Sequence, residues 1–137
     1  MRKGISLLIA VLISASGCTP LHKNRELLEL SGEGREKLAT HYASVIEKEY
    51  PPTGCILTVS SETPFGQSLT RALQEKGYRL SDKPIEGSTD VSYLVDNLGE
   101  GIGLSVVSVG ETLRLSRSFR VEEKDVQLSS MTVERRS

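Results

Sequence analysis

The sequence predicts a two-layer α+β domain, with helices packed on one face of a mostly antiparallel sheet of four to five strands. Two segments with helical apolar spacing come first in the domain, at residues 35–49 and 64–76. Three long segments with apolar residues at alternate positions follow, and short glycine-containing turns join them. Strands joined by short turns pair as antiparallel neighbours, which leaves the two helices to cover one face of the sheet.

The first 17 residues have the pattern of a secretory signal peptide. Arg2 and Lys3 give a positive start, residues 5–13 form an apolar run interrupted only by Ser6, and residues 14–17 carry only small side chains. The apolar run is too short to cross a bilayer, which requires about 20 apolar residues. We therefore expect residues 1–17 to be removed during export.

Cys18 follows these small residues directly, and Ala15-Ser16-Gly17-Cys18 resembles the bacterial lipobox, with Ala15 in place of the usual leucine. The resemblance implies a covalent lipid on Cys18, which becomes the first mature residue. By the same resemblance, the absence of aspartate at Thr19 permits sorting to the outer membrane, with the chain facing the periplasm. An ordinary cleaved signal peptide with an incidental cysteine is the alternative.

Length and net charge limit the number of domains and the kinds of partner of the mature chain. Removing residues 1–17 from 137 leaves 120, enough for one domain and a tether. The formal net charge is −1, and becomes −3 without Arg2 and Lys3, so we expect no direct contact with nucleic acid. Aromatic residues make up only 4% of the chain, which leaves Leu, Val and Ile to form the core.

Residues 18–34 are expected to form a flexible leash before a single periplasmic domain at residues 35–137. The leash is polar near the anchor, and Ser31-Gly32-Glu33-Gly34 interrupts helical structure. Its leucines, Leu27, Leu28 and Leu30, either fold back onto the domain or contact a partner protein. We favour the partner, because a segment beside the lipid is where a partner would be met.

The helix boundaries follow from local signals. The helix at residues 35–49 has an apolar stripe from Leu38 to Ile46 and ends before Pro51, because a residue preceding proline is pushed out of the α region. Thr63 can cap the second helix, Pro64 suits its first position, and Gly77 ends it.

The strands are expected at residues 54–60, 78–80, 89–98, 102–109, 112–121 and 131–133. In the strand at residues 112–121 an apolar inward face is interrupted by Arg117. Alternation places a polar, positively charged row on its outward face: Arg114, Ser116, Ser118 and Arg120.

No arrangement of residues indicates catalysis. His22 and His41 have no neighbouring cysteine or carboxylate cluster, so we expect no metal and no cofactor other than the lipid. A serine-nucleophile motif is absent, and the glycines of residues 99–103 lie between two strands, as in a hairpin rather than a phosphate loop. We expect a protein that is not an enzyme and takes no small-molecule substrate.

If Cys18 is lipidated, Cys55 is left without an intramolecular partner in an oxidising compartment. A buried thiol and an interchain disulfide are both open. The first is favoured, because Cys55 shares a strand face with Leu57 and Val59.

Several segments together resemble the TrbH family of conjugal transfer lipoproteins. They are Phe65-Gly66-Gln67-Ser68-Leu69, Ala72-Leu73-Gln74-Glu75-Lys76-Gly77-Tyr78, Val91-Ser92-Tyr93-Leu94-Val95-Asp96 and Leu113-Arg114-Leu115-Ser116-Arg117-Ser118-Phe119. The resemblance implies a component of the mating-pair formation apparatus, a type IV secretion system, that supports the outer-membrane core complex. It carries over no catalytic residues.

The partner contacts expected on this basis are Leu27, Leu28, Leu30, Arg114 and Arg120, which would dock a larger outer-membrane subunit. A row of solvated charge that prevents aggregation of the sheet is the alternative for the arginines. Two other functions stay open for the whole chain. One is an assembly factor for outer-membrane components, and the other is an exclusion lipoprotein that inhibits transfer.

We predict that Cys18→Ala abolishes incorporation of radioactive fatty acid into the protein, because the thiol that accepts the lipid is lost. Buried methylenes contribute about 0.8 kcal/mol each, so the variant should also leave the membrane fraction on washing. Cys55→Ser is the matched control and should label normally. Labelling that persists in Cys18→Ala would show that the lipid is not on this residue.

Overall fold

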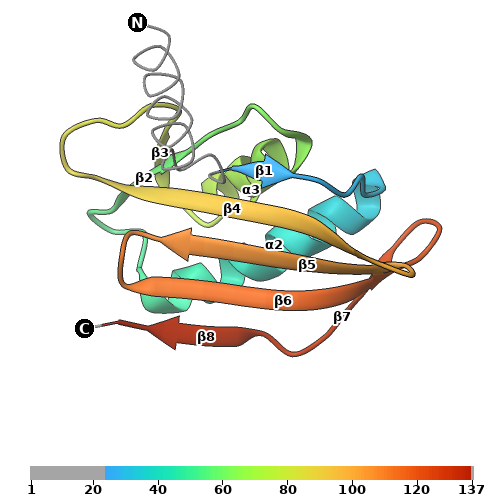
Figure 1. The fold of residues 1–137 in the computed structure, drawn as a ribbon. Helices are drawn as coiled ribbons and strands as arrows, with labels where there is room; N and C mark the ends of the chain where they lie inside the picture. The colour runs from blue at the N-terminus through green and yellow to red at the C-terminus, as the bar shows by residue number, and fades with distance from the viewer. Residues whose placement is uncertain (1–23, 137) are drawn as a thin grey trace, which may run out of the picture.

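The computed structural model describes residues 24–136, so the predicted signal peptide, Cys18 and His22 lie outside the described residues. The described chain forms two helices, α2 (Gly32–Glu49) and α3 (Pro64–Glu75), on one side of a sheet (Figure 1). The strands are β1 (Arg25–Glu26), β2 (Ile56–Val59), β3 (Arg79–Ser81), β4 (Ser88–Gly99), β5 (Ile102–Val109), β6 (Leu113–Val121), β7 (Val126–Leu128) and β8 (Thr132–Arg135).

The strand order is β3-β2-β4-β5-β6-β7, with β1 also paired to β4 and β8 to β6. The α+β class is confirmed, but within residues 24–136 the sheet has eight strands and is mixed, whereas we expected four to five mostly antiparallel strands. β2 and β3 pair in parallel, because α3 carries the chain from the end of β2 back across the sheet before β3 begins. β4 also pairs in parallel with β1 and with β2. β1 and β7 were missed because two or three residues are too few to show alternation.

The core lies between the helices and the inner face of the sheet. Its largest fully buried side chains include Tyr42 of α2 and Phe65 of α3, which meet edge to face with ring centroids 6.4 Å apart. Phe65 meets Tyr93 of β4 in the same way at 5.3 Å. The Tyr42 hydroxyl donates to the Ser105 carbonyl at 3.1 Å, and burial raises the pKa of Tyr42 to about 12.

The second half of the predicted leash belongs to the folded domain. β1 pairs with β4, and α2 begins at Gly32 rather than residue 35 because Ser31 caps it, its hydroxyl accepting the Gly34 N–H at 3.1 Å. Glycine suits position 34, because a Cβ there would lie 3.0 Å from Val126 Cγ1 and 3.2 Å from Ser31 Oγ, closer than ordinary van der Waals contact. The glycines that indicated a break are therefore compatible with the start of a helix.

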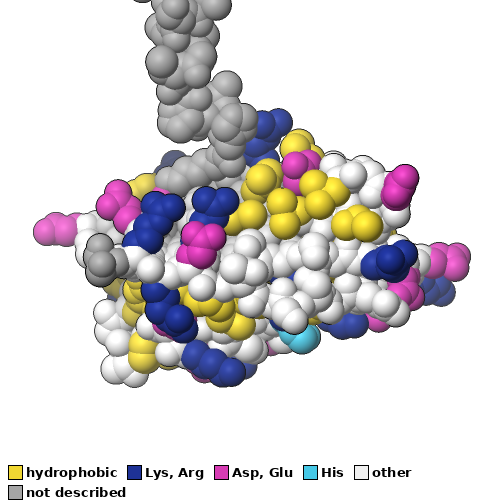
Figure 2. Space-filling model, turned by 60° about the horizontal axis from the view of Figure 1, so that its bottom comes forward, with side chains coloured by type: hydrophobic (Ala, Val, Ile, Leu, Met, Phe, Trp, Pro, Cys, Tyr) yellow, Lys and Arg dark blue, Asp and Glu magenta, His cyan; other side chains and the backbone are white. Residues whose placement is uncertain are grey.

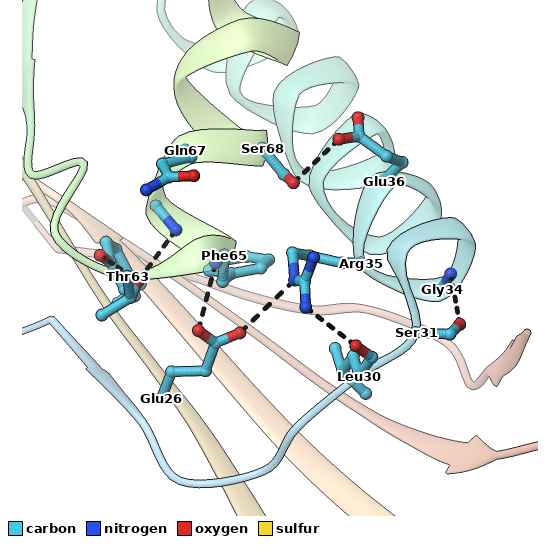
Figure 3. A network of polar contacts seen from close by, with 12 residues as sticks. Glu26, Leu30, Ser31, Gly34, Arg35, Glu36, Thr63, Phe65, Gln67 and Ser68 are labelled. Atoms are coloured by element: carbon cyan, nitrogen blue, oxygen red, sulfur yellow. Dashed lines mark hydrogen bonds and ion pairs between the residues drawn. The ribbon is translucent and has the colours of Figure 1, made fainter.

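A polar network fastens this segment to both helices (Figure 3). The Glu26 carboxylate accepts the Phe65 N–H at the start of α3 at 3.2 Å, and Arg35 Nε of α2 lies 3.8 Å from Glu26 Oε1. Arg35 also donates to the Leu30 carbonyl at 2.9 Å. The acidic side chain at a helix N-terminus compensates the helix dipole, so one residue of β1 ties α3 and α2 to the edge of β4.

We predict that Gly66→Ala destabilises the protein, although alanine favours a helix by about 1 kcal/mol. A Cβ at position 66 would overlap the Ser60 carbonyl and the Tyr93 hydroxyl, and overpacking of this kind costs about 1–3 kcal/mol. Gly32→Ala is the control, because nothing lies within 4 Å of the added carbon. Urea unfolding should give a lower midpoint for Gly66→Ala alone, and equal midpoints would contradict the packing described.

Candidate interaction surface

The sheet presents a second face, here called the outer face, on the side away from the helices (Figure 1). Within residues 24–136 both helices lie on the inner side, where alternate residues of β4 and β5 are buried. The outer face consists of the intervening residues of the three long strands and of one residue each from β1 and β8. They are Asp90, Ser92, Leu94 and Asp96 of β4; Ile102, Leu104, Val106 and Ser108 of β5; Arg114, Ser116, Ser118 and Arg120 of β6; Arg25 of β1; and Glu134 of β8.

The centre of the outer face is apolar. Leu94 lies opposite Val106 in the register, and Leu104 is the next outward residue of β5; all three are only half-buried. Leu27 adjoins them, because its N–H bonds to the Val95 carbonyl at 2.6 Å, and it is 50% exposed. Figure 2 shows hydrophobic side chains gathered on one face beside charged ones. A sheet face in water is usually polar, and a cluster of this kind is typical of a contact surface.

Charged side chains border this apolar centre. Arg114 lies between Ser108 and Glu134 in the register, and it lines a shallow hollow of about 560 Å³ together with Arg136. Arg120 lies beside Ile102 and lines a second hollow of about 260 Å³. Both hollows are open depressions along β5 and β6, suited to side chains of a partner rather than to enclosing a substrate.

The expected partner contacts divide into two groups. Arg114 and Arg120 are exposed on the outer face, as alternation predicted, and Leu27 is exposed beside it. Leu30, however, is 3% exposed within the core, and Leu28 packs against that core, near Gly103. The prediction that Leu30 contacts a partner is therefore wrong, because this leucine closes the core where the chain enters α2.

Sequence reasoning missed the apolar residues Leu94, Leu104 and Val106. Their signal was present in β5, where Ile102, Leu104 and Val106 occupy one alternation and Val107 and Val109 the other. A strand with apolar residues on both alternations is typical of a strand covered on both faces.

Two other residues singled out by the sequence lie away from the outer face. Cys55 is half-buried rather than buried, because it precedes β2 at the sheet margin, and burial raises the pKa of its thiol. Arg117 lies on the helix side, its guanidinium 3.2 Å from His41 Nδ1. Burial, followed by the charges of Arg117 and Lys37, lowers the pKa of His41.

Among residues 24–136 there is no group of three or more His, Cys, Asp or Glu side chains that could hold a metal ion. In the same range, neither helix is long and apolar enough to cross a membrane.

The fold and the outer face define a class of protein: a two-layer α+β domain with one covered sheet face and one surface suited to contact with other proteins. The family model described as conjugal transfer protein TrbH matches residues 18–137. The chain belongs to the TrbH family of conjugal transfer proteins. No curated protein and no solved structure matches it.

We predict that Val106 is dispensable for folding, whereas its neighbour Val107 is not. Val107→Thr places a hydroxyl at a position that is 0% exposed and should cost about 1–3 kcal/mol. Val106→Thr keeps the β-branched shape on the outer face and should change stability by no more than about 0.5 kcal/mol. Chemical denaturation of both variants checks this, and a large loss for Val106→Thr would mean that something covers this face.

Proposed function

We propose that this TrbH-family protein is a lipid-anchored, non-enzymatic component of a conjugal type IV secretion apparatus. It is held at the outer membrane by the lipid on Cys18, faces the periplasm, and supports the core complex during mating-pair formation. The observation that carries the proposal is the half-buried apolar centre of the outer face, bordered by Arg114 and Arg120, in a member of a conjugal transfer family.

The composition of the outer face favours protein contact. Half-buried aliphatic residues at its centre can be fully desolvated by a partner, whereas the arginines at the border can form charged hydrogen bonds. The same face carries acidic residues, Asp96 on β4 and Glu134 on β8, so it lacks the uniform positive charge that binds a phosphate backbone.

The anchor makes a modest surface sufficient. A lipid on Cys18 would confine the protein to the membrane that holds the apparatus, which raises the effective concentration of each partner. The family match begins at Cys18 itself, which supports the proposal that the mature chain starts there. Only residues 19–23 would then separate the lipid from the first described residue, Asn24.

We predict that the double variant Arg114→Glu, Arg120→Glu loses its partners in the envelope and lowers DNA transfer at least about tenfold, because like charges then face the partner. Recovery of complexes from detergent-solubilised envelopes and mating frequency are measured in parallel. Leu27→Asp tests the apolar centre alone; Leu28 and Leu30 are left intact because they pack in or against the core.

The control is Lys48→Glu, Lys83→Glu, which makes the same change in net charge at exposed positions off the outer face. Circular dichroism and urea unfolding confirm that each variant is folded. If the folded outer-face variants keep every partner and transfer DNA normally, the face is only solvated and the docking role is wrong. A deletion strain that transfers DNA more efficiently than wild type would instead indicate an inhibitor.

A further inference from the structure

The charges of the outer face are arranged in strips that follow the strands. β4 carries Asp90 and Asp96 on this face, β5 carries no charge, and β6 carries Arg114 and Arg120. The two acidic residues are six positions apart, as are the two arginines, so both pairs span about 20 Å along their strands. An acidic strip and a basic strip with matched spacing thus lie on either side of an apolar one.

The basic strip of β6 is shifted along the strand direction relative to the acidic strip of β4, by the same step at both ends. Residues that pair across neighbouring strands in the register are here called level. Asp96 is level with Leu104 and Ser118, and Arg120 follows two residues after Ser118. Arg114 is level with Ser108 and Ser92, two residues after Asp90. In both cases the arginine is displaced from the acid by two residues in the same direction, about 7 Å along the strand, which a long arginine side chain can bridge.

β1 and β8, which pair with the far sides of β4 and β6, each add one charged residue of the opposite sign to the neighbouring strip. Arg25 of β1 is level with Leu94 of β4. Glu134 of β8 is level with Arg114 and therefore with Ser92, which is two residues before Leu94 on β4. The basic residue is again displaced from the acidic one by the same step. Read from β1 to β8, the strips are basic, acidic, apolar, basic and acidic.

Such a face is complementary to itself about a two-fold axis running along β5. That axis places the β4 side of one copy over the β6 side of the other, so acidic strips meet basic ones and Leu104 and Val106 meet their own counterparts. A two-fold interface requires this reciprocity, in which each residue and its partner exchange roles between copies. Packing of two sheets with nearly aligned strands is a common arrangement, with the layers about 10 Å apart.

We propose that the occupant of the outer face is a second copy of this chain, and that the protein assembles through a sheet-on-sheet dimer. This names the partner of the docking surface and rests on the proposed function. The face is five strand positions wide, with β2 and β1 in succession beside β4, and β8 and β7 in succession beside β6. At about 4.8 Å per strand position and about 24 Å along β5, it covers on the order of 600 Å² per copy, near the lower end for specific interfaces. The dimer is therefore weak in dilute solution and favoured by co-anchoring.

The direction of the axis agrees with the anchor. Asn24, the first described residue, bonds through its side-chain oxygen to the Tyr93 N–H at 3.2 Å, at the edge of β4. Rotation about an axis parallel to the strands does not change the position of a residue along the strand direction. Asn24 of both copies therefore lies at the same position along the axis, and the tethers begin there. Both lipids can then enter one membrane perpendicular to the axis.

The test uses Asp96→Arg and Arg120→Asp, which exchange the charges of one proposed contact. Within one chain these positions are separated by β5, and the Asp96 carboxylate accepts the Asn97 N–H at 2.8 Å, so folding of each variant is verified by urea unfolding. Full-length chains with two different tags are produced in the same cells, and recovery of one copy with the other is measured from solubilised envelopes.

Each variant paired with itself brings like charges together in both contacts of the dimer. We expect co-recovery to fall at least about tenfold for either variant alone. When Asp96→Arg is paired with Arg120→Asp, both contacts regain opposite charges, and co-recovery should return to within about twofold of wild type. Lys83→Glu, which lies off the face, should behave as wild type in every combination.

The dimer is overturned if co-recovery of the mixed pair is no higher than that of either variant paired with itself. It is also overturned if one tagged wild-type copy does not recover the other. If DNA transfer still depends on Arg120 in that case, the outer face binds a different protein, and the proposed function holds without the dimer. If mixing restores the dimer but transfer never depends on it, the dimer stands and the docking role in transfer fails.

Discussion

The burial of one sheet face under α2 and α3 is the constraint on which the rest of this structure depends. Side chains of a strand alternate between the two faces, so fixing Tyr93 and Val95 against the helices places Leu94 and Asp96 on the outer face. A slip of one residue would bury Asp96 and expose the tyrosine ring. The same packing therefore sets the register and the composition of the contact surface.

Close approach of backbone and side chains holds the two layers together. The Tyr93 hydroxyl lies 2.6 Å from the Thr63 hydroxyl and donates to the Ser60 carbonyl at 3.1 Å, which links β4 to the chain between β2 and α3. Gly66 leaves room for this tyrosine, and Gly103 leaves room for the Phe119 ring and Leu28. In a core with few aromatic rings, such contacts position each ring without leaving cavities.

The segment before α2 would join the proposed membrane tether to the domain. Glu26, Arg35 and the Leu30 carbonyl join β1 to both helices, so tension on such a tether would act on β4 rather than on a loose chain end. The proposed contact surface is built on that strand and its neighbours. Its position relative to Asn24, the first described residue, is consequently fixed by the fold.

The sequence alone determined the α+β class, both helices, the three long strands and the outward direction of Arg114 and Arg120. These features follow from periodicity and local capping, which short stretches of chain encode by themselves. Only the tertiary structure decided that Leu30 is buried, that β1 pairs with β4, and that Leu94, Leu104 and Val106 form one apolar centre. The physical reason is that these outcomes depend on contacts between segments far apart in the chain, and local spacing carries no information about which strands become neighbours.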